Sequence, residues 1–310
     1  MGYTHKPVLA QECIALLNIQ MGDTVVDGTL GLGGHASLIL PLVGENGRLI
    51  GIDQDERALA MAKERLGDKP TYLHTSFFSI KEALAGQGIE TVNGILLDLG
   101  VSSYQLDDAT RGFSYMQDGP LDMRMNGENP LTARDVVNTY SQEDLERIIK
   151  EYGEERWARR IAQFIVEKRQ QIPIETSFQL VDVIKAAIPK GARRDGPHPA
   201  KRTYQAIRVE VNNELDGLTK GLLAAMDCLS IHGTLCVITF HSLEDRIVKQ
   251  VFMEKSRTCS CPPEAIQCTC DRIQRFERVT KKPITPSEAE LEENPRARSA
   301  KLRAIRRLAF

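Results

Sequence analysis

Three aspartates stand at the ends of apolar runs in the first third of the chain, where they could bind a ligand or accept a proton. Asp27 closes the run that begins at Thr24, Asp53 closes Leu49-Ile50-Gly51-Ile52, and Asp98 closes the run from Gly94. Such runs are typical of parallel strands, and parallel sheets bind ligands beyond the carboxyl ends of their strands. The three carboxylates are therefore the first candidates for a functional site.

A glycine-rich turn follows Asp27, with the sequence Asp27-Gly28-Thr29-Leu30-Gly31-Leu32-Gly33-Gly34-His35. Strand, turn, helix and a second strand ending in Asp53 form the βαβ pattern that binds the adenosine half of a cofactor. The spacing of Gly31, Gly33 and Ala36 also satisfies a dinucleotide pattern, which leaves a nicotinamide enzyme open. Asp27 favours S-adenosylmethionine, because its carboxylate attracts an ammonium and a sulfonium but repels a diphosphate.

The run that ends at Asp98 continues into Leu99-Gly100-Val101-Ser102-Ser103. It is expected beside the first strand, at the point where the strand order reverses, so ligand and substrate should meet there. The alternative role for Asp98 is to cap a turn or helix.

Composition is that of an ordinary globular protein, with 310 residues, 42% of them hydrophobic, and a net charge of -2. This charge predicts no overall attraction to nucleic acid, so any such binding must use local patches. Two basic segments could be such patches or solvated faces, Lys190 to Arg208 and Arg296 to Arg307. No apolar run approaches the roughly 20 residues of a membrane span and no signal peptide is evident, so we expect a cytoplasmic protein without a membrane partner.

Strand and helix patterns alternate from Thr24 to Ser103 and resume after Arg208, which predicts an α/β fold with a Rossmann-like sheet. The expected strands are 24–27, 48–53, 71–77, 94–99 and 233–240, with a weaker antiparallel pair near 276–279 and 302–305. Only helical patterns occur between them. The sequence therefore predicts a discontinuous domain, residues 1–103 and 208–310, interrupted by a helical insertion at 104–207.

Seven cysteines are present, and four of them form the cluster Cys259, Cys261, Cys268 and Cys270. Four thiolates could hold a structural zinc, although CxC pairs differ from the usual CxxC knuckle. Reduced loop thiols or disulfides remain the alternatives, so the metal content stays open.

Several long segments resemble one known family, the bacterial 16S rRNA (cytosine-N4) methyltransferases. The matching segments are His5 to Leu9, Asp27 to His35, Leu96 to Asp107, Arg111 to Ser114, Gly119 to Met125 and Phe240 to Arg246. The resemblance implies a class I methyltransferase that transfers a methyl group from S-adenosylmethionine to a cytidine amine in 16S rRNA, at the decoding centre of the small ribosomal subunit.

The resemblance also implies roles for single residues. Gly33, Gly34 and His35 would line the methionine part of the cofactor, and Asp53 would bind the ribose hydroxyls. Phe77 would pack near the adenine, although Phe78 adjoins it and could replace it. Asp98 and Gln105 would complete the cofactor site.

The target atom follows from chemistry. Methylation at cytosine C5 requires a cysteine nucleophile, whereas an exocyclic amine can attack the methyl directly once its proton has an acceptor. No cysteine lies between Asp98 and Gln105, which favours the amine. The proton acceptor is Asp98 or a backbone carbonyl.

RNA would be held by the insertion and the basic segment beside it. Lys201, Arg202 and Arg208 could bind phosphates, and Tyr204 could stack on an extruded base. His241, after the fifth parallel strand, is expected to face the same cleft, while Ser242 caps the next helix. A non-catalytic ribosome-assembly factor is the alternative from another class, and it would not need Asp53, Asp98 and the glycine turn.

Overall fold

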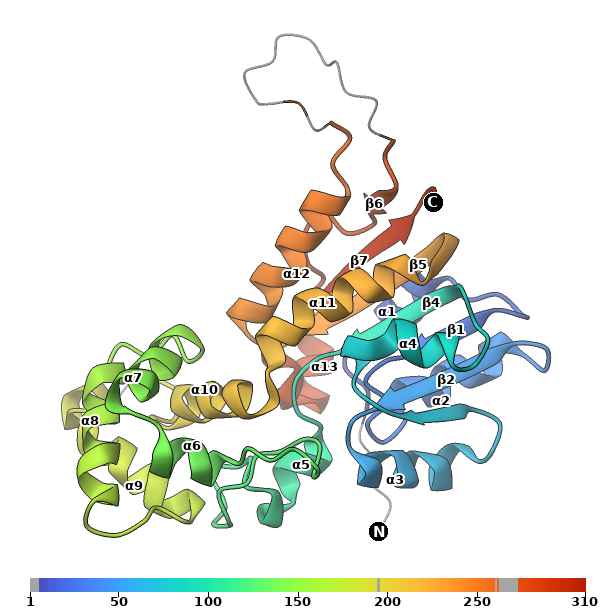
Figure 1. Ribbon diagram of the computed structural model, residues 1–310. Helices are drawn as coiled ribbons and strands as arrows, with labels where there is room; N and C mark the ends of the chain where they lie inside the picture. The colour runs from blue at the N-terminus through green and yellow to red at the C-terminus, as the bar shows by residue number, and fades with distance from the viewer. Residues whose placement is uncertain (1–5, 194–195, 260, 262–272) are drawn as a thin grey trace. The chain divides into compact units, whose positions relative to one another are not determined.

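The computed structural model describes residues 6–193, 196–259, 261 and 273–310, and it divides into two compact units (Figure 1). The first unit comprises Met1–Gly100 with Leu215–Phe310, and the second is Val101–Glu214. The second unit extends beyond the predicted limits of 104 and 207. Its later end has a simple reason, since helix α10 (Lys201–Asn212) continues without a break through residue 207.

A sheet of seven strands forms the centre of the first unit, in the order β3-β2-β1-β4-β5-β7-β6. The strands are β1 (Thr24–Asp27), β2 (Arg48–Asp53), β3 (Thr71–His74), β4 (Val92–Asp98), β5 (Leu229–Thr239), β6 (Phe276–Arg278) and β7 (Lys301–Arg307). β1 to β5 are parallel, and β7 runs antiparallel to both β5 and β6. The predicted α/β, Rossmann-like class is confirmed.

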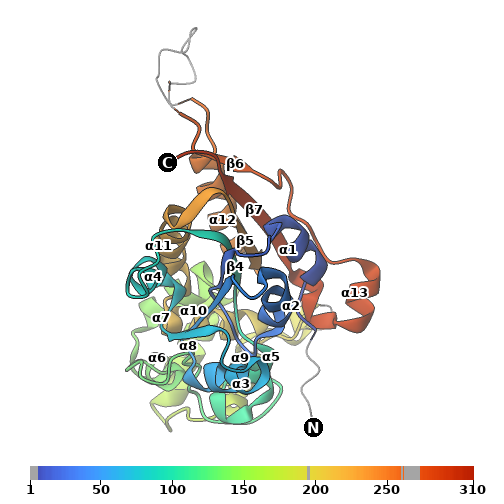
Figure 2. The ribbon, with the colours of Figure 1, turned by 90° about the vertical axis from the view of Figure 1, so that its right-hand side faces the viewer.

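Helices cover both faces of this sheet (Figure 2). One core contains residues of α1 (Ala10–Leu17), α2 (Gly34–Val43) and α3 (Glu56–Leu66), and the other contains residues of α4 (Ile80–Ala85), α11 (Glu214–Asp227) and α12 (Ser242–Lys255). Consecutive strand residues enter opposite cores, as Val25 and Val26 of β1 do. A strand alternates its side chains in this way, so continuous apolar runs indicate a sheet covered twice.

β5 begins at Leu229, four residues before the predicted start, and two further features of the first unit also differ from the sequence-based expectations. β3 ends at His74 instead of residue 77, because the Ser76 hydroxyl accepts a hydrogen bond from the Phe78 amide and begins a 3₁₀ turn, Phe77–Ser79. The second basic segment, Arg296 to Arg307, is not simply a solvated surface patch, because several of its cations are held by contacts within the first unit. Its Arg303 lies 2.6 Å from an Asp245 carboxylate oxygen, and its Arg307 donates to main-chain carbonyls at the end of α11.

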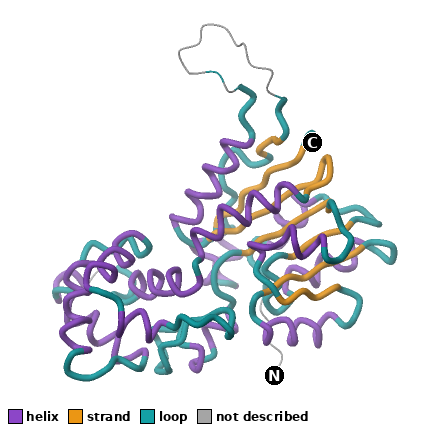
Figure 3. The backbone as a smooth tube through the Cα atoms, viewed as in Figure 1, coloured by secondary structure: helices purple, strands orange, loops and turns teal. Residues whose placement is uncertain are grey.

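The second unit consists of helices joined by loops (Figure 3). The helices are α5 (Ser103–Asp107), α6 (Ala133–Thr139), α7 (Gln142–Glu151), α8 (Ala158–Arg169), α9 (Ser177–Ala187) and α10. Their apolar faces form a separate core that includes Ile148, Ile161, Ile184 and Ile207. Among the described helices of both units, none is long and apolar enough to cross a membrane.

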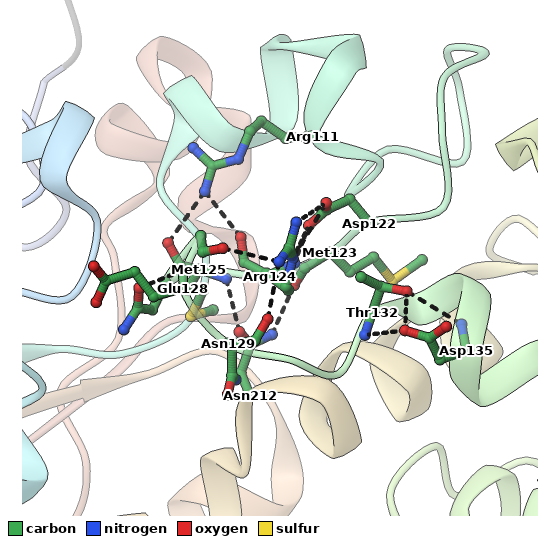
Figure 4. A network of polar contacts seen from close by, with 12 residues as sticks. Arg111, Asp122, Met123, Arg124, Met125, Glu128, Asn129, Thr132, Asp135 and Asn212 are labelled. Atoms are coloured by element: carbon green, nitrogen blue, oxygen red, sulfur yellow. Dashed lines mark hydrogen bonds and ion pairs between the residues drawn. The ribbon is translucent and has the colours of Figure 1, made fainter.

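The loop between α5 and α6 is fastened by two arginines and an asparagine (Figure 4). Arg124 donates to both carboxylate oxygens of Asp122, and Arg111 donates to the carbonyls of Arg124 and Met125. From α10, Asn212 accepts from the Met125 amide and donates to the Met123 carbonyl. These contacts hold buried Met123 at a φ of 59°, a conformation that costs a non-glycine residue about 1–2 kcal/mol.

Gly112, in the same loop, should be intolerant of a side chain. Its φ is 70°, and an added Cβ would lie 2.1 Å from the Pro120 carbonyl oxygen, a backbone atom that no rotamer change can move. We expect Gly112→Ala to lower the free energy of unfolding by about 2 kcal/mol or more in chemical denaturation. Gly127→Ala is the matched control, since its Cβ would meet nothing within 4 Å. Equal losses in the two variants would contradict this account of the loop.

Candidate active site

The three predicted carboxylates lie at one edge of the sheet. Asp27, Asp53 and Asp98 are the last residues of β1, β2 and β4, and these strands are adjacent and parallel. The chain order of the strands reverses between β1 and β4. Open α/β sheets bind their ligands in the crevice at this reversal, so the geometry agrees with the site expected from the sequence.

The glycine turn after β1 is bonded to the strands on both sides. The Gly28 amide donates to the Leu96 carbonyl of β4 at 2.8 Å, and the Leu30 amide donates to the Ile52 carbonyl of β2 at 2.9 Å. Gly33 has a φ of 74°, and an added Cβ there would come within 2.8 Å of the Leu66 side chain. Glycine is thus required at Gly33 both by conformation and by space.

Asp53 is fixed by backbone amides. One carboxylate oxygen accepts from the Gly31 amide at 2.7 Å, and the other accepts from the Asp55 amide at 2.9 Å. The Gln54 amide also bonds to this carboxylate, and because a carboxylate offers about four lone-pair positions, acceptor capacity remains for a ligand's hydroxyl group. Asp53 therefore both orders the glycine turn and keeps acceptor capacity toward the edge of the sheet.

Helix α2 begins directly after the turn, with Gly33 as its N-cap. Gly33 has no side chain with which to cap the helix, and the first turn of α2 carries no acidic residue. The first amides of a helix are donors without intrahelical partners, and the helix dipole favours an anion beside them. This helix start is suited to a carboxylate of a bound ligand.

Asp98 has one carboxylate oxygen, Oδ1, that is buried and has no hydrogen-bond partner among the described residues. Its backbone amide donates to the Thr29 hydroxyl at 2.6 Å, which ties the end of β4 to the glycine turn. The side chain as a whole remains 25% exposed. A buried acceptor without a partner is costly, and such an acceptor in a crevice points to a ligand or substrate that supplies the donor.

His35 connects this carboxylate to the N-terminal segment. Its Nε2 lies 2.9 Å from the Val8 carbonyl oxygen, and its Nδ1 lies 3.7 Å from Asp98 Oδ2. A carbonyl can only accept, so Nε2 carries a proton, and in the neutral ring Nδ1 presents its lone pair to Asp98. Val8 is held in turn by its neighbour, because the Leu9 amide donates to Glu290 of α13 (Glu288–Glu293) at 2.8 Å.

Burial, and to a lesser extent neighbouring negative charges, raises the pKa of each of the three carboxyl groups. Burial, together with the charges of Asp27 and Glu244, raises the pKa of Asp98 to about 8. Burial raises the pKa of Asp27 to about 7, although a hydrogen bond from Thr29 opposes it, and raises that of Asp53 to about 6. A cationic ligand would relieve this destabilisation of the charged forms, whereas a diphosphate would increase it.

Comparison with known proteins agrees with this geometry. The family model described as the MraW methylase family matches residues 2–308. The chain belongs to the MraW methylase family.

Curated relatives match along the whole length. A protein of Ruminiclostridium cellulolyticum named ribosomal RNA small subunit methyltransferase H is 52% identical, over 99% of this chain and 100% of its own. Proteins with the same name from Clostridioides difficile and Symbiobacterium thermophilum are also 52% identical, over 99% of this chain and 100% and 98% of their own.

The cofactor of this methylase is S-adenosylmethionine. The chain's own residues fit it, because three neighbouring carboxyl groups, Asp27 buried and Asp53 and Asp98 partly buried, suit a ligand with an ammonium and a sulfonium. The same carboxyl groups disfavour binding of a nicotinamide dinucleotide. The alternative of a nicotinamide-dependent enzyme is overturned because the chain belongs to a methylase family.

Two other predicted cofactor residues have structural contacts. The Phe77 ring packs against α11, where a Cβ on Gly221 would lie 2.7 Å from it, and it meets the Phe78 ring edge to face with centroids 4.6 Å apart. Gln105 belongs to the second unit and forms a capping box with Ser102 at the start of α5. The pattern Ser-x-x-Gln could have identified this cap from the sequence. The cofactor roles of Phe77 and Gln105 remain predictions.

The residues predicted to bind RNA divide into two groups. Lys201 and Arg202, at the start of α10, are exposed. Arg208 is bidentately paired with Glu214, and its side chain is 15% exposed. Tyr204 is 3% exposed, with its hydroxyl donating to the Ser177 carbonyl. The prediction that Tyr204 stacks on a base is therefore wrong, because its ring is part of the core of the helical unit.

His241 is the N-cap of α12, a role that was predicted for Ser242. Its Nε2 lies 3.1 Å from a Glu244 carboxylate oxygen, and its side chain is 9% exposed. Glu244 also accepts from the Phe240 and His241 amides. The capping box uses Nδ1 of His241, whereas its buried Nε2 has no hydrogen-bond partner among the described residues, so RNA contact by His241 stays a prediction.

The cysteine cluster lies partly outside the described residues. Cys259 and Cys261 are of intermediate exposure, and the Cys261 amide donates to the Cys259 sulfur at 3.3 Å, whereas Cys268 and Cys270 fall in the segment that is not described. The zinc hypothesis therefore stays a prediction.

Cofactor binding should release protons. Asp98, Asp27 and Asp53 have pKa values of about 8, 7 and 6, and a cationic ligand favours their ionised forms. Affinity for S-adenosylmethionine should therefore rise as the pH rises from about 6 to about 8. Calorimetry at pH 7 in buffers of different ionisation enthalpy measures the released protons. A binding enthalpy that is independent of the buffer would contradict the predicted release of protons from these carboxyl groups.

Proposed function

We propose that this protein transfers a methyl group from S-adenosylmethionine to N4 of a cytidine in 16S rRNA, at the decoding centre of the small ribosomal subunit. The observation that carries the proposal is the unpartnered Oδ1 of Asp98 at the strand-order reversal of a methylase sheet. The names of the relatives support small-subunit rRNA as the substrate and the cytoplasm as the place of action.

The amine is favoured over ring carbon C5 because the buried cysteines are unsuited to nucleophilic attack. Cys13, Cys228 and Cys236 are buried in the first unit. Burial raises the pKa of all three thiols, that of Cys228 to about 11, so none is a ready thiolate. A cytosine amine needs no covalent activation, only alignment and a proton acceptor.

S-adenosylmethionine, when bound, supplies an electrophilic methyl group on its sulfonium. Asp53 accepts from the ribose hydroxyls, and Asp27 counters the cationic charge. Gly33, Gly34 and His35 line the methionine part at the start of α2, where the helix dipole favours its carboxylate. Asp98 accepts a hydrogen bond from the cytidine amine and takes up its proton, and His35 lies beside it with Nδ1 3.7 Å from Oδ2.

Methyl transfer to isolated subunits tests the proposal. Small subunits that lack the modification are incubated with methyl-labelled S-adenosylmethionine, with large subunits as the control. We expect label in small-subunit rRNA alone. Cofactor binding without any transfer would instead support the alternative of a non-catalytic assembly factor.

Lys201 and Arg202 are the cations we assign to RNA phosphates. Their simultaneous replacement by alanine should weaken small-subunit binding and reduce the slope of log affinity against log salt by about 1–2, one per lost phosphate contact. Cofactor affinity should be unchanged. The matched control replaces Arg159 and Lys168, two exposed cations of α8. The same slope in both double variants would show that Lys201 and Arg202 are solvated surface residues that do not contact RNA phosphates.

A further inference from the structure

Two aromatic rings are stacked at the surface of the helical unit. The rings of Tyr115 and His198 lie nearly parallel, with an interplanar angle of 11° and centroids 4.7 Å apart. Both side chains are only partly buried. Tyr115 belongs to the loop before α6, and His198 precedes α10, so the pair joins segments more than 80 residues apart in the sequence.

The two stacked rings are held in place by neighbouring residues. Tyr204 meets the Tyr115 ring edge to face at 5.7 Å, and the Tyr204 hydroxyl is anchored on the Ser177 carbonyl at 2.8 Å. His198 lies between Pro197 and Pro199, and its Nδ1 accepts from the Ala200 amide at 3.2 Å. Little conformational entropy remains for the two rings to lose when a ligand packs on them.

The surroundings of the pair are cationic. Lys201 is exposed three residues after His198, and Lys185 of α9 is close enough that its charge, after burial, lowers the pKa of His198. The Asp118 carboxylate, whose charge acts on Tyr204, accepts from the Phe178 and Gly119 amides, and hydrogen bonds of this kind lower its pKa and keep it ionised. The imidazole is therefore neutral at pH 7, and its ring is available for stacking beside positive charges.

We infer that Tyr115 and His198 form a stacking platform for an unpaired base of the RNA substrate, with Lys201 on the adjoining phosphate. The inference rests on the proposed function and names a contact within it. A flat, rigid aromatic surface beside cations is the usual means of holding single-stranded nucleic acid. It also replaces the role expected of Tyr204, which supports the platform from the core.

The experiment compares His198→Ala with His198→Trp in the full-length protein. Stacking is weakly dependent on salt, and loss of one stacked base should weaken binding to small subunits by about 5- to 100-fold. We expect that loss in His198→Ala with an unchanged salt slope, and recovery in His198→Trp, which restores a flat ring. Lys201→Ala is the contrasting control, since it should change the slope.

Three results would overturn the inference. They are wild-type affinity in His198→Ala, an equal loss in both His198 variants, and a loss on subunits with none on single-stranded polycytidylate, which would indicate a protein partner. Methyl transfer by the wild-type protein is measured on the same subunits. Its absence would refute the proposed function, while the comparison of affinities would still decide the role of the platform.

Discussion

Asp98→Asn should slow methyl transfer by about 100-fold or more when cofactor and subunit are both saturating. Cytosine N4 is a poor nucleophile because its lone pair is delocalised into the ring, so an acceptor for its proton matters most in the transition state. Asparagine preserves the size and one oxygen but removes the charge. Single-turnover transfer of labelled methyl measures the effect, and calorimetry should show weaker but detectable cofactor binding.

The pH dependence separates an acceptor from a merely structural residue. The wild-type rate should rise with pH as Asp98 ionises, and a bound cation should shift that rise below the Asp98 pKa of about 8. The Asn variant should lose this rise. Wild-type transfer by Asp98→Asn would move the acceptor to a backbone carbonyl between Leu99 and Val101.

Asp53→Ala should weaken S-adenosylmethionine binding by about 2–3 kcal/mol, or roughly 30- to 150-fold. Charge-assisted hydrogen bonds from two ribose hydroxyls account for this amount. The substitution also releases the Gly31 amide, which Asp53 holds at 2.7 Å, so the glycine turn loses its order as well. Calorimetric titration of the purified variant gives the affinity.

Asp68→Ala is the control for Asp53→Ala, because it removes a carboxylate whose side chain is 88% exposed. Its cofactor affinity should equal that of the wild type, and both variants should melt cooperatively. Unchanged affinity in Asp53→Ala would remove Asp53 from the cofactor site.

The sheet could be predicted because each strand carries a strong local signal. Continuous apolar runs such as Gly94 to Leu97 indicate strands buried on both faces, and the cores observed on both sides of the sheet agree with that pattern. The position of β7 between β5 and β6 could not be read in the same way. Its weak alternation indicated only one strand of an antiparallel pair, and the pairing of Arg303 with Asp245, a partner 58 residues away, leaves no local signal.

The carboxylates of the site followed from strand ends, but their partners did not. The contact of His35 with Val8 depends on how the N-terminal segment folds back, and that of Thr29 with the Asp98 amide depends on the packing of β1 against β4. Local sequence patterns contain no signal for either of these two contacts. The burial of Tyr204 could have been predicted from the sequence, however. Helical spacing places it on one buried face with Ala200, Ile207 and Val211.

Mass spectrometry of rRNA nucleosides tests the central claim most directly. Small-subunit rRNA is purified from cells that contain the protein, cells that lack it, and cells that carry Asp98→Asn at the same level. We predict N4-methylated cytidine in the first sample and its loss, at one position, in the other two. N4 methylation that persists without the protein, or a loss of C5 methylation instead, would contradict the account.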